Sequence, residues 1–180
     1  MKVVGIDQSA NHTGVAVLAS DGTLLLSELI EPKTRDTVRL VDIYNTLDAL
    51  LAKHAPYDIG VWESYSMKSQ HRAFLLGEVG GIVQILLSRY SARVESCAPK
   101  SLKKFVALSG DASKGEMKAA VARRWGVRFT DDNLADAYGL ARFGFALLDG
   151  TGLTLRKQVE VRTPRKRAKK KPFRSNNGLL

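Results

Sequence analysis

Three apolar runs follow one another at the start of the chain, separated by short turns of polar residues and glycine. They span residues 2–7, 13–19 and 22–30, and Asp21 and Gly22 form the second turn. Tight turns of this kind join antiparallel strands that are neighbours in a sheet. The sequence therefore predicts a three-stranded antiparallel meander as the first part of the fold.

After the meander, the pattern changes to an alternation of helices and strands. Residues 35–54 carry apolar side chains at helical spacing, and residues 58–63 form a short apolar run that ends on an acid. Further along the chain we expect one more strand over 92–96 and helices over 72–90, 99–108, 114–125 and 132–148. This order of elements predicts an α/β fold.

The positive charge of the chain is concentrated at its end. Ten of the 28 Lys and Arg residues fall within residues 151–180 beside a single acid, Glu160, so this segment carries nine of the ten formal net charges. Hydrophobic periodicity fades there, apart from a weak alternation over 153–161 that suits a short edge strand. We therefore expect one domain over residues 1–150 and a basic, disordered tail over residues 151–180.

A solvated basic tail on a nearly neutral domain usually meets nucleic acid or an anionic membrane. We favour contact with DNA phosphates over a nuclear-localisation or purely solubilising role. The tail residues that we expect to bind DNA are Arg165, Lys166, Arg167, Lys169, Lys170 and Lys171.

Composition also excludes several classes of protein. The single cysteine, Cys97, excludes an internal disulfide framework and a zinc site built on several thiolates. We recognise no apolar run of membrane-spanning length and no charged and then apolar leader at the N-terminus. We expect a soluble, cytoplasmic protein with no membrane partner.

Acidic residues stand at the ends of several predicted elements. Asp7 ends the first strand, Glu63 ends a later strand, and the last predicted helix begins with Asp132 and Asn133, either of which shares a face with Asp136. Carboxylates gathered from separate elements repel one another unless a cation neutralises them. Oxygen ligands without a histidine or cysteine cluster suit Mg²⁺ or Mn²⁺, and a pair of such ions is a recurrent apparatus for hydrolysing phosphodiesters.

Each acid taken alone also has a structural explanation. Asp7 suits a turn, Asp132 suits a helix N-cap, and Glu63 suits the exposed end of a strand. Asp136 is different, because the stretch LADAYGLA surrounds it with small and apolar residues, among which an unpaired charge is costly. Taken together, the acids therefore favour a functional site over separate structural roles.

Four stretches, in this order, resemble the RuvC-type Holliday junction resolvases of the RNase H-like superfamily. The resemblance covers residues 2–148 and lies in motifs more than in overall identity. The stretches are GIDQSANHTG (5–14), VWESYSMKSQHRAFLLGEVGGIVQILL (61–87), APKSLKKFVALSGDASKGEM (98–117) and DDNLADAYGLA (131–141). The resemblance implies an RNase H-like mixed β-sheet flanked by α-helices. It also implies a homodimer that makes paired symmetric incisions in four-way DNA junctions.

The resemblance also assigns roles to individual residues. It implies that Asp7, Glu63 and Asp136 bind two Mg²⁺ ions per site, with Mn²⁺ able to substitute, and that Lys103 is an active-site lysine. The fourth metal ligand falls on Asp132 or on Asn133, with Asp132 the better donor by charge. The implied DNA contacts in the body are Lys100, Lys104, Lys114 and Tyr65, with Tyr65 or Met67 in the place of a residue that wedges into the junction.

Other functions stay open at this point. An RNase H-like nuclease acting on other branched DNA or on RNA–DNA hybrids would share the metal chemistry. A noncatalytic DNA-binding module would explain the basic tail but not the acids. An ATP-binding protein of the wider superfold would need a second lobe and a second phosphate loop, so we expect no nucleotide cofactor.

Overall fold

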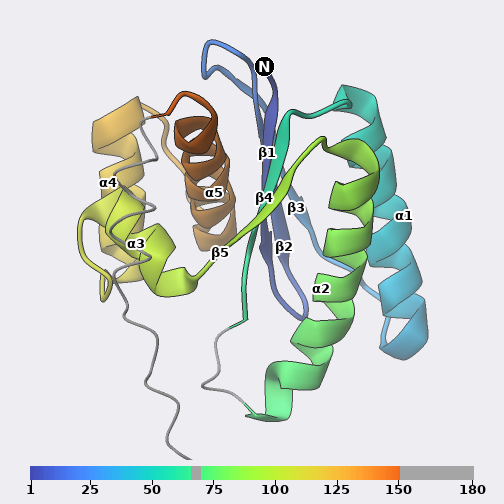
Figure 1. Cartoon of the computed structure of the whole chain (residues 1–180). Coiled ribbons are helices and arrows are strands. Elements are labelled where there is room, and N and C mark those ends of the chain that lie inside the picture. Colours follow the sequence, from blue (N-terminus) through green and yellow to red (C-terminus); the bar gives the residue numbers. More distant parts are fainter. Residues whose placement is uncertain (66–69, 151–180) are drawn as a thin grey trace, which may run out of the picture.

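The fold centres on a five-stranded sheet, seen edge-on in Figure 1. The computed structural model describes residues 1–65 and 70–150, leaving out the side chains of residues 70–72. The strands are β1 (Val3–Gln8), β2 (Thr13–Leu18), β3 (Leu24–Ile30), β4 (Ile59–Glu63) and β5 (Val94–Cys97). Their order is β3-β2-β1-β4-β5, with β1, β2 and β3 antiparallel and β1, β4 and β5 parallel. The sheet is therefore mixed, and β1 is buried along its whole length.

Helices cover both faces of the sheet (Figure 1). One face carries α1 (Asp36–His54) and α2 (Gln70–Tyr90), and the other carries α3 (Pro99–Ala107), α4 (Lys114–Trp125) and α5 (Asp132–Leu148). Because successive residues of a strand point to opposite faces, the sheet contributes side chains to two separate cores. Val4 and Ile6 of β1 pack with the α1 and α2 core, whereas Val3 packs with the core around α5.

The predicted elements are present, and their ends are shifted by at most two residues. The antiparallel meander and the α/β alternation are thus confirmed. The suggested edge strand over 153–161, the alternative wedge residue Met67 and the six DNA-binding residues of the tail lie outside the described residues, and the expected end of the domain at residue 150 coincides with their limit.

One helix among the described residues, α2 over Ala73–Tyr90, is long and apolar enough to cross a membrane by length and composition alone. This corrects the expectation that the sequence holds no such run, because Glu78 and Arg89 are the sole acidic or basic residues in that window. In the structure α2 packs on α1 and on the sheet, and Val79 and Val83 are fully buried in the core.

Candidate active site

Asp7 and Glu63 lie side by side because they end two neighbouring parallel strands. The register between β1 and β4 brings the carboxyl ends of the two strands level. Gly5 and Val61, two residues earlier on each strand, meet α5, so the side chains of both acids point toward the same helix.

Asp136 reaches these two acids because α5 approaches the sheet closely. A Cβ atom on Gly5 would overlap the backbone of Ala137 and of the next turn of the helix, and one on Gly14 would overlap the backbone of Asn133. Glycine is needed at both places, since any larger residue would push the helix away. The close approach puts the second turn of α5, with Asp136, over the end of β1.

All three carboxyl groups have a raised pKa, and burial is the largest cause for each. The pKa of Asp7 is well above its usual value, first because the residue is buried and then because Glu63 and Asp136 are near. Burial and Asp136 together raise the pKa of Glu63 to about 7. Burial raises the pKa of Asp136 to about 6. Such clusters of mutually perturbed acids are concentrated at functional sites.

Hydrogen bonding with the Asp7 side chain acts in the opposite direction and lowers the pKa of Glu63. Two carboxyl groups can hydrogen bond to each other when one of them keeps its proton. Within the described part of the chain, no three acidic, His or Cys side chains stand close enough to enclose one ion. The three acids are therefore electrostatic neighbours that would have to draw together around a cation.

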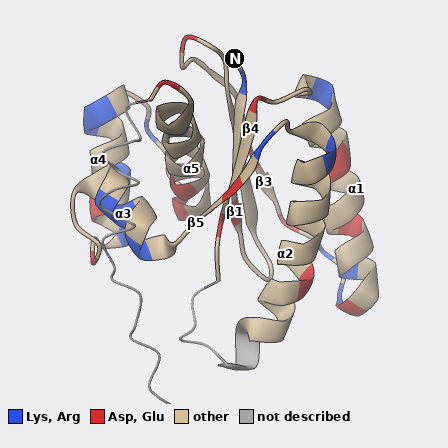
Figure 2. Cartoon of the chain, in the orientation of Figure 1, with Lys and Arg blue, Asp and Glu red and all other residues tan. Residues whose placement is uncertain are grey.

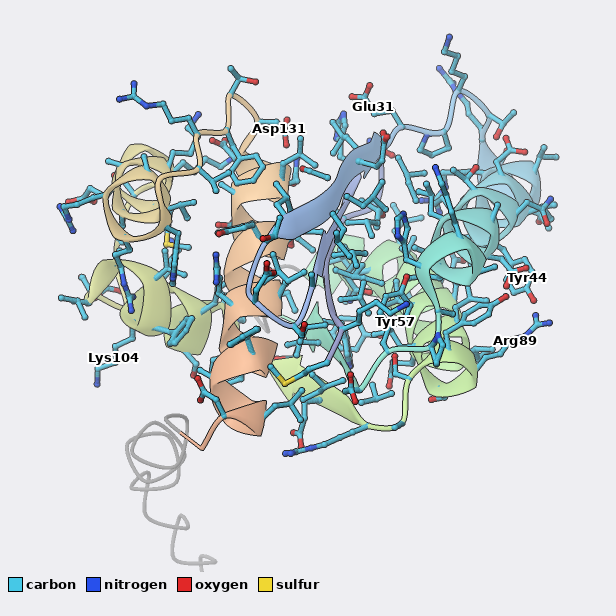
Figure 3. All side chains as sticks on the ribbon, turned by 90° about the horizontal axis from the view of Figure 1, so that it is seen from above. Glu31, Tyr44, Tyr57, Arg89, Lys104 and Asp131 are labelled. Carbon is cyan, nitrogen blue, oxygen red and sulfur yellow. The ribbon has the colours of Figure 1, made fainter. Side chains whose placement is uncertain are left out.

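Lys103 supplies positive charge to this group from the inner side of α3. Its side chain is half-buried, and its charge lowers the pKa of both Glu63 and Asp136. Lys104, the next residue, is exposed and points away from the sheet on the outer side of α3 (Figure 3). The structure therefore separates these two lysines, and Lys103 is the one beside the acids.

The start of α5 gives its polar residues different partners. The Asp131 carboxylate caps the helix by accepting hydrogen bonds from the backbone N–H groups of Asn133 and Leu134. The Asp132 carboxylate instead forms salt bridges with Lys114 and Lys118 of α4, each at 2.9 Å, and these lysines lower its pKa. The carbonyl of Asn133 lies against Gly14, which pairs with Asp7 across the sheet.

Sequence reasoning gave no role to Asp131 or Lys118. The carboxylate of Asp131 helps to raise the pKa of Asp7, and Lys118 holds Asp132. Asp131 stands in the quoted stretch DDNLADAYGLA, where its place before the helix marks it as an N-cap. The pairing of Lys118 depends on how α4 packs on α5, which no local pattern reveals.

The other expected DNA contacts in the body are three lysines on α3 and α4, and Tyr65 after β4. Figure 2 shows Lys and Arg gathered on α3 and α4, where Lys100 pairs with Asp111 at 3.1 Å. Tyr65 follows β4 and is 41% exposed. Its ring meets Trp62 edge-on at 5.5 Å, and its hydroxyl fills the space that a side chain on Gly80 of α2 would need.

Comparison with known proteins gives a consistent picture. The family model described as crossover junction endodeoxyribonuclease RuvC matches residues 3–142. A protein of that name from Hyphomonas neptunium is 30% identical over 128 residues, which are 68% of this chain and 77% of the relative. Another from Carboxydothermus hydrogenoformans is 28% identical over 156 residues, covering 83% of this chain and 99% of the relative.

Solved structures agree on the fold. The Thermus thermophilus RuvC structure matches with a TM-score of 0.70 and 25% identity, covering 84% of this chain and 98% of that one. A structure of T. thermophilus RuvC in complex with Holliday junction substrate has the same fold, with a TM-score of 0.71 and 24% identity over 84% of this chain and 97% of that one. The likeness confirms the predicted RNase H-like mixed sheet flanked by helices.

Proposed function

This chain belongs to the RuvC family of crossover junction endodeoxyribonucleases, and from that premise we propose that it is a Holliday junction resolvase. Its reaction would be the hydrolysis of phosphodiester bonds in four-way DNA junctions. The observation that carries this proposal is the group formed by Asp7, Glu63 and Asp136, which come from three elements, are buried or half-buried together and all have raised pKa values. The curated relatives are bacterial, and we place the reaction in the cytoplasm of a bacterial or virus-infected cell.

A divalent cation fits the chemistry of this donor set. Three carboxyl groups that resist ionisation because of burial and mutual repulsion would gain from a cation between them. Asp7, Glu63 and Asp136 would hold it, and all-oxygen ligands suit Mg²⁺, with Mn²⁺ as a substitute. We propose two ions per site, and Asp7, the most deeply buried of the three acids and a neighbour of both others, would be one of their ligands.

The fourth ligand is Asp132 or Asn133. Asp132 has the charge, but its two salt bridges commit its carboxylate to α4. Asn133 is three residues before Asp136, its backbone carbonyl lies against Gly14, and its side-chain N–H donates a hydrogen bond to Asp131 at 3.2 Å. The salt bridges of Asp132 therefore favour the side-chain oxygen of Asn133 as the donor and leave Asp132 as the counter-ion of two lysines.

The residues of this chain have separate tasks in the reaction. When bound, the ions would lower the pKa of an attacking water and neutralise charge on the phosphate. Lys103 would stabilise the negative charge that develops on the phosphate oxygens as the bond breaks. Asp7 and Glu63 would give up the proton between them before the site carries its full negative charge. No side chain is required as a covalent nucleophile.

Two sites related by a two-fold axis would explain paired, symmetric cuts, so we propose that the working form is a homodimer. The described residues leave an apolar face on α1 and α2, and we call it the α1/α2 face: Val38, Val41, Phe74, Leu75 and Ile85, each at least 41% exposed. Beside it an open cleft of about 410 Å³ lies between the two helices. A second copy of the chain is the occupant that the two-fold symmetry of a junction calls for.

DNA would be held mainly by positive charge. We propose that Lys100, Lys104 and Lys114 contact phosphates near the cut and that the basic tail adds affinity without choosing the site. Each phosphate that the tail neutralises should steepen the fall of log affinity with log salt by about 0.9 on duplex DNA. We propose Tyr65 as the residue that meets the branch point, because it is exposed and follows Glu63 by two residues.

The test is a cleavage assay on a panel of DNA structures. Four-way junctions, flaps, RNA–DNA hybrids, duplexes and single strands would be compared at equal concentration with Mg²⁺, Mn²⁺ or a chelator. We expect paired, symmetric cuts in four-way junctions that stop when the chelator is added. Faster cutting of flaps or hybrids would assign another RNase H-like nuclease, and binding without cutting in either metal would assign a DNA-binding module.

A further inference from the structure

A single basic side chain among the described residues is buried, and it belongs to Arg39 of α1. Its exposed fraction is 6%, on the side of α1 that faces the sheet and α2. Taking a guanidinium out of water is costly unless its N–H groups find partners. The partners of Arg39 therefore indicate what this residue is for.

The two terminal nitrogens of Arg39 bind two different segments. Nη1 donates a hydrogen bond to the carbonyl oxygen of Ala10, in the turn between β1 and β2. Nη2 donates to the carboxylate of Glu78 on α2 at 3.1 Å. One side chain thus ties α1 to the turn and to α2 at once.

The turn that Arg39 holds begins two residues after Asp7, the first acid of the site. Ala10 is three residues beyond Asp7, and Gly14 at the far side of the turn pairs with Asp7. The turn has its own bonds, because the Ser9 hydroxyl donates to the carbonyl and accepts from the N–H of His12. Those bonds shape the turn, whereas Arg39 fixes it to the helices.

We propose that Arg39 is a positioning residue, which pins the turn between β1 and β2 to the α1 and α2 layer and so holds Asp7 in register with Glu63. Glu78 keeps the guanidinium aimed at Ala10. The proposal rests on the proposed function of the Asp7 site. It assigns a role in catalysis to a residue on the face of the sheet opposite α5.

The test compares Arg39→Met and Arg39→Lys with a matched control at the other end of the same helix pair. Asp48 of α1 accepts hydrogen bonds from Arg89 and Tyr90 of α2, so Arg89→Met also removes a contact between α1 and α2 but far along the chain from the turn. Figure 3 labels Arg89 at the outer edge of this helix pair. Each variant would be measured by hydrogen exchange at residues 9–13, junction affinity, single-turnover cleavage rate and thermal unfolding.

We expect Arg39→Met to speed hydrogen exchange in the turn and to lower the cleavage rate by about ten-fold or more, since misplacement of a reacting group by ~1 Å can cost about 100-fold. Junction affinity should change little. Arg39→Lys should restore part of both properties, because an ammonium can still bind the Ala10 carbonyl. Arg89→Met should keep the wild-type exchange and rate.

Two results would overturn the proposal. One is a folded Arg39 variant with wild-type exchange in the turn and a wild-type cleavage rate. The other is an equal loss in Arg89→Met, which would make the effect a general loosening of the helix pair. If Arg39→Met does not fold, Arg39→Lys decides by the same criteria. Hydrogen exchange needs neither DNA nor metal, so a failure of the nuclease proposal would show separately, as wild-type protein that cuts no junction.

Discussion

The two faces of the sheet are covered by helices of similar apolar character but different exposure. On one face α5 lies between the sheet and the α3 and α4 pair, and eight of its residues, including Ala137, Tyr138 and Ala141, are buried. On the other face α2 is covered on its inner side alone and leaves Phe74 and Ile85 at 83% and 64% exposure. The buried acids at α5 indicate a catalytic site, whereas the exposed apolar side chains of α2 indicate a surface that binds a partner.

The largest loss of cleavage activity should come from substituting the acids grouped at α5. Asp7→Asn or Glu63→Gln removes a charge from the metal ligands with little change in shape, so cleavage should fall by more than about 1,000-fold, or ~4 kcal/mol in the barrier. Junction affinity, measured by gel shift in Ca²⁺, should stay near the wild-type value. Appreciable Mg²⁺-dependent cutting by either variant would remove the site from this face.

Two glycines test how tightly each helix lies on its surroundings. Gly5→Val forces α5 away from β1 and should cost about 3 kcal/mol in the free energy of unfolding, at the upper end for overpacked cores. Gly77→Ala on α2 meets open space and should add about 0.5–1 kcal/mol through helix propensity. Urea denaturation measures both. A well-tolerated Gly5→Val would mean that α5 has room to shift and that the placement of Asp136 is looser than described.

The acids should also make the metal-free protein lose stability as pH rises. The pKa of Glu63 is raised to about 7 and that of Asp136 to about 6, so between pH 5 and 8 the folded state binds more protons than the unfolded state. The stabilisation is complete below the unfolded pKa values and is lost as pH passes the folded ones, a change of about 4 kcal/mol between pH 5 and pH 8.

Denaturant titrations of metal-free protein at pH 5 and pH 8 measure this loss. Glu63→Gln cannot ionise at that position and should lose less stability over the same interval, which separates Glu63 from the other titrating groups. Saturating Mg²⁺ should reverse the trend, because the cation binds the ionised carboxylates of the folded state. An identical pH dependence in wild type and Glu63→Gln would contradict the shared burial of the acids.

Substitutions on the α1/α2 face should change how strongly two copies of the chain associate. Ile85→Glu places a charge on this face and should raise the dimer dissociation constant by about 30-fold, or ~2 kcal/mol. Leu108→Glu is the matched control, since Leu108 is 78% exposed at the end of α3, beside the opposite face of the sheet. Light scattering over a range of concentrations gives both constants. If both proteins stay wild-type dimers, or if wild type is a monomer at micromolar concentration, the face serves another partner.

The sequence predicted most of the fold because its elements are short and strongly patterned. Asp7 and Glu63 could be found since each stands where an apolar strand stops, and Asp136 since small and apolar residues surround it. The sequence could not reveal which residues of separate elements contact one another. The placement of Tyr65 on Gly80, and of Arg39 on Ala10 and Glu78, depends on how separate elements pack, which leaves no local pattern.

The smallest change in cleavage rate should come from substituting Asp132, which lies between the acids grouped at α5 and the lysines of α4. If Asp132 is the counter-ion of Lys114 and Lys118, Asp132→Ala frees both lysines for phosphate and should leave cleavage within about five-fold of wild type, ~1 kcal/mol in the barrier. Affinity for junction and for plain duplex should rise together at low salt. Asn133→Ala, measured beside it, should cost more cleavage because it removes the side-chain oxygen that we propose as the fourth metal ligand. The opposite order, with Asp132→Ala as inactive as Asp7→Asn, would make Asp132 the fourth ligand, and its salt bridges would then have to open when metal binds.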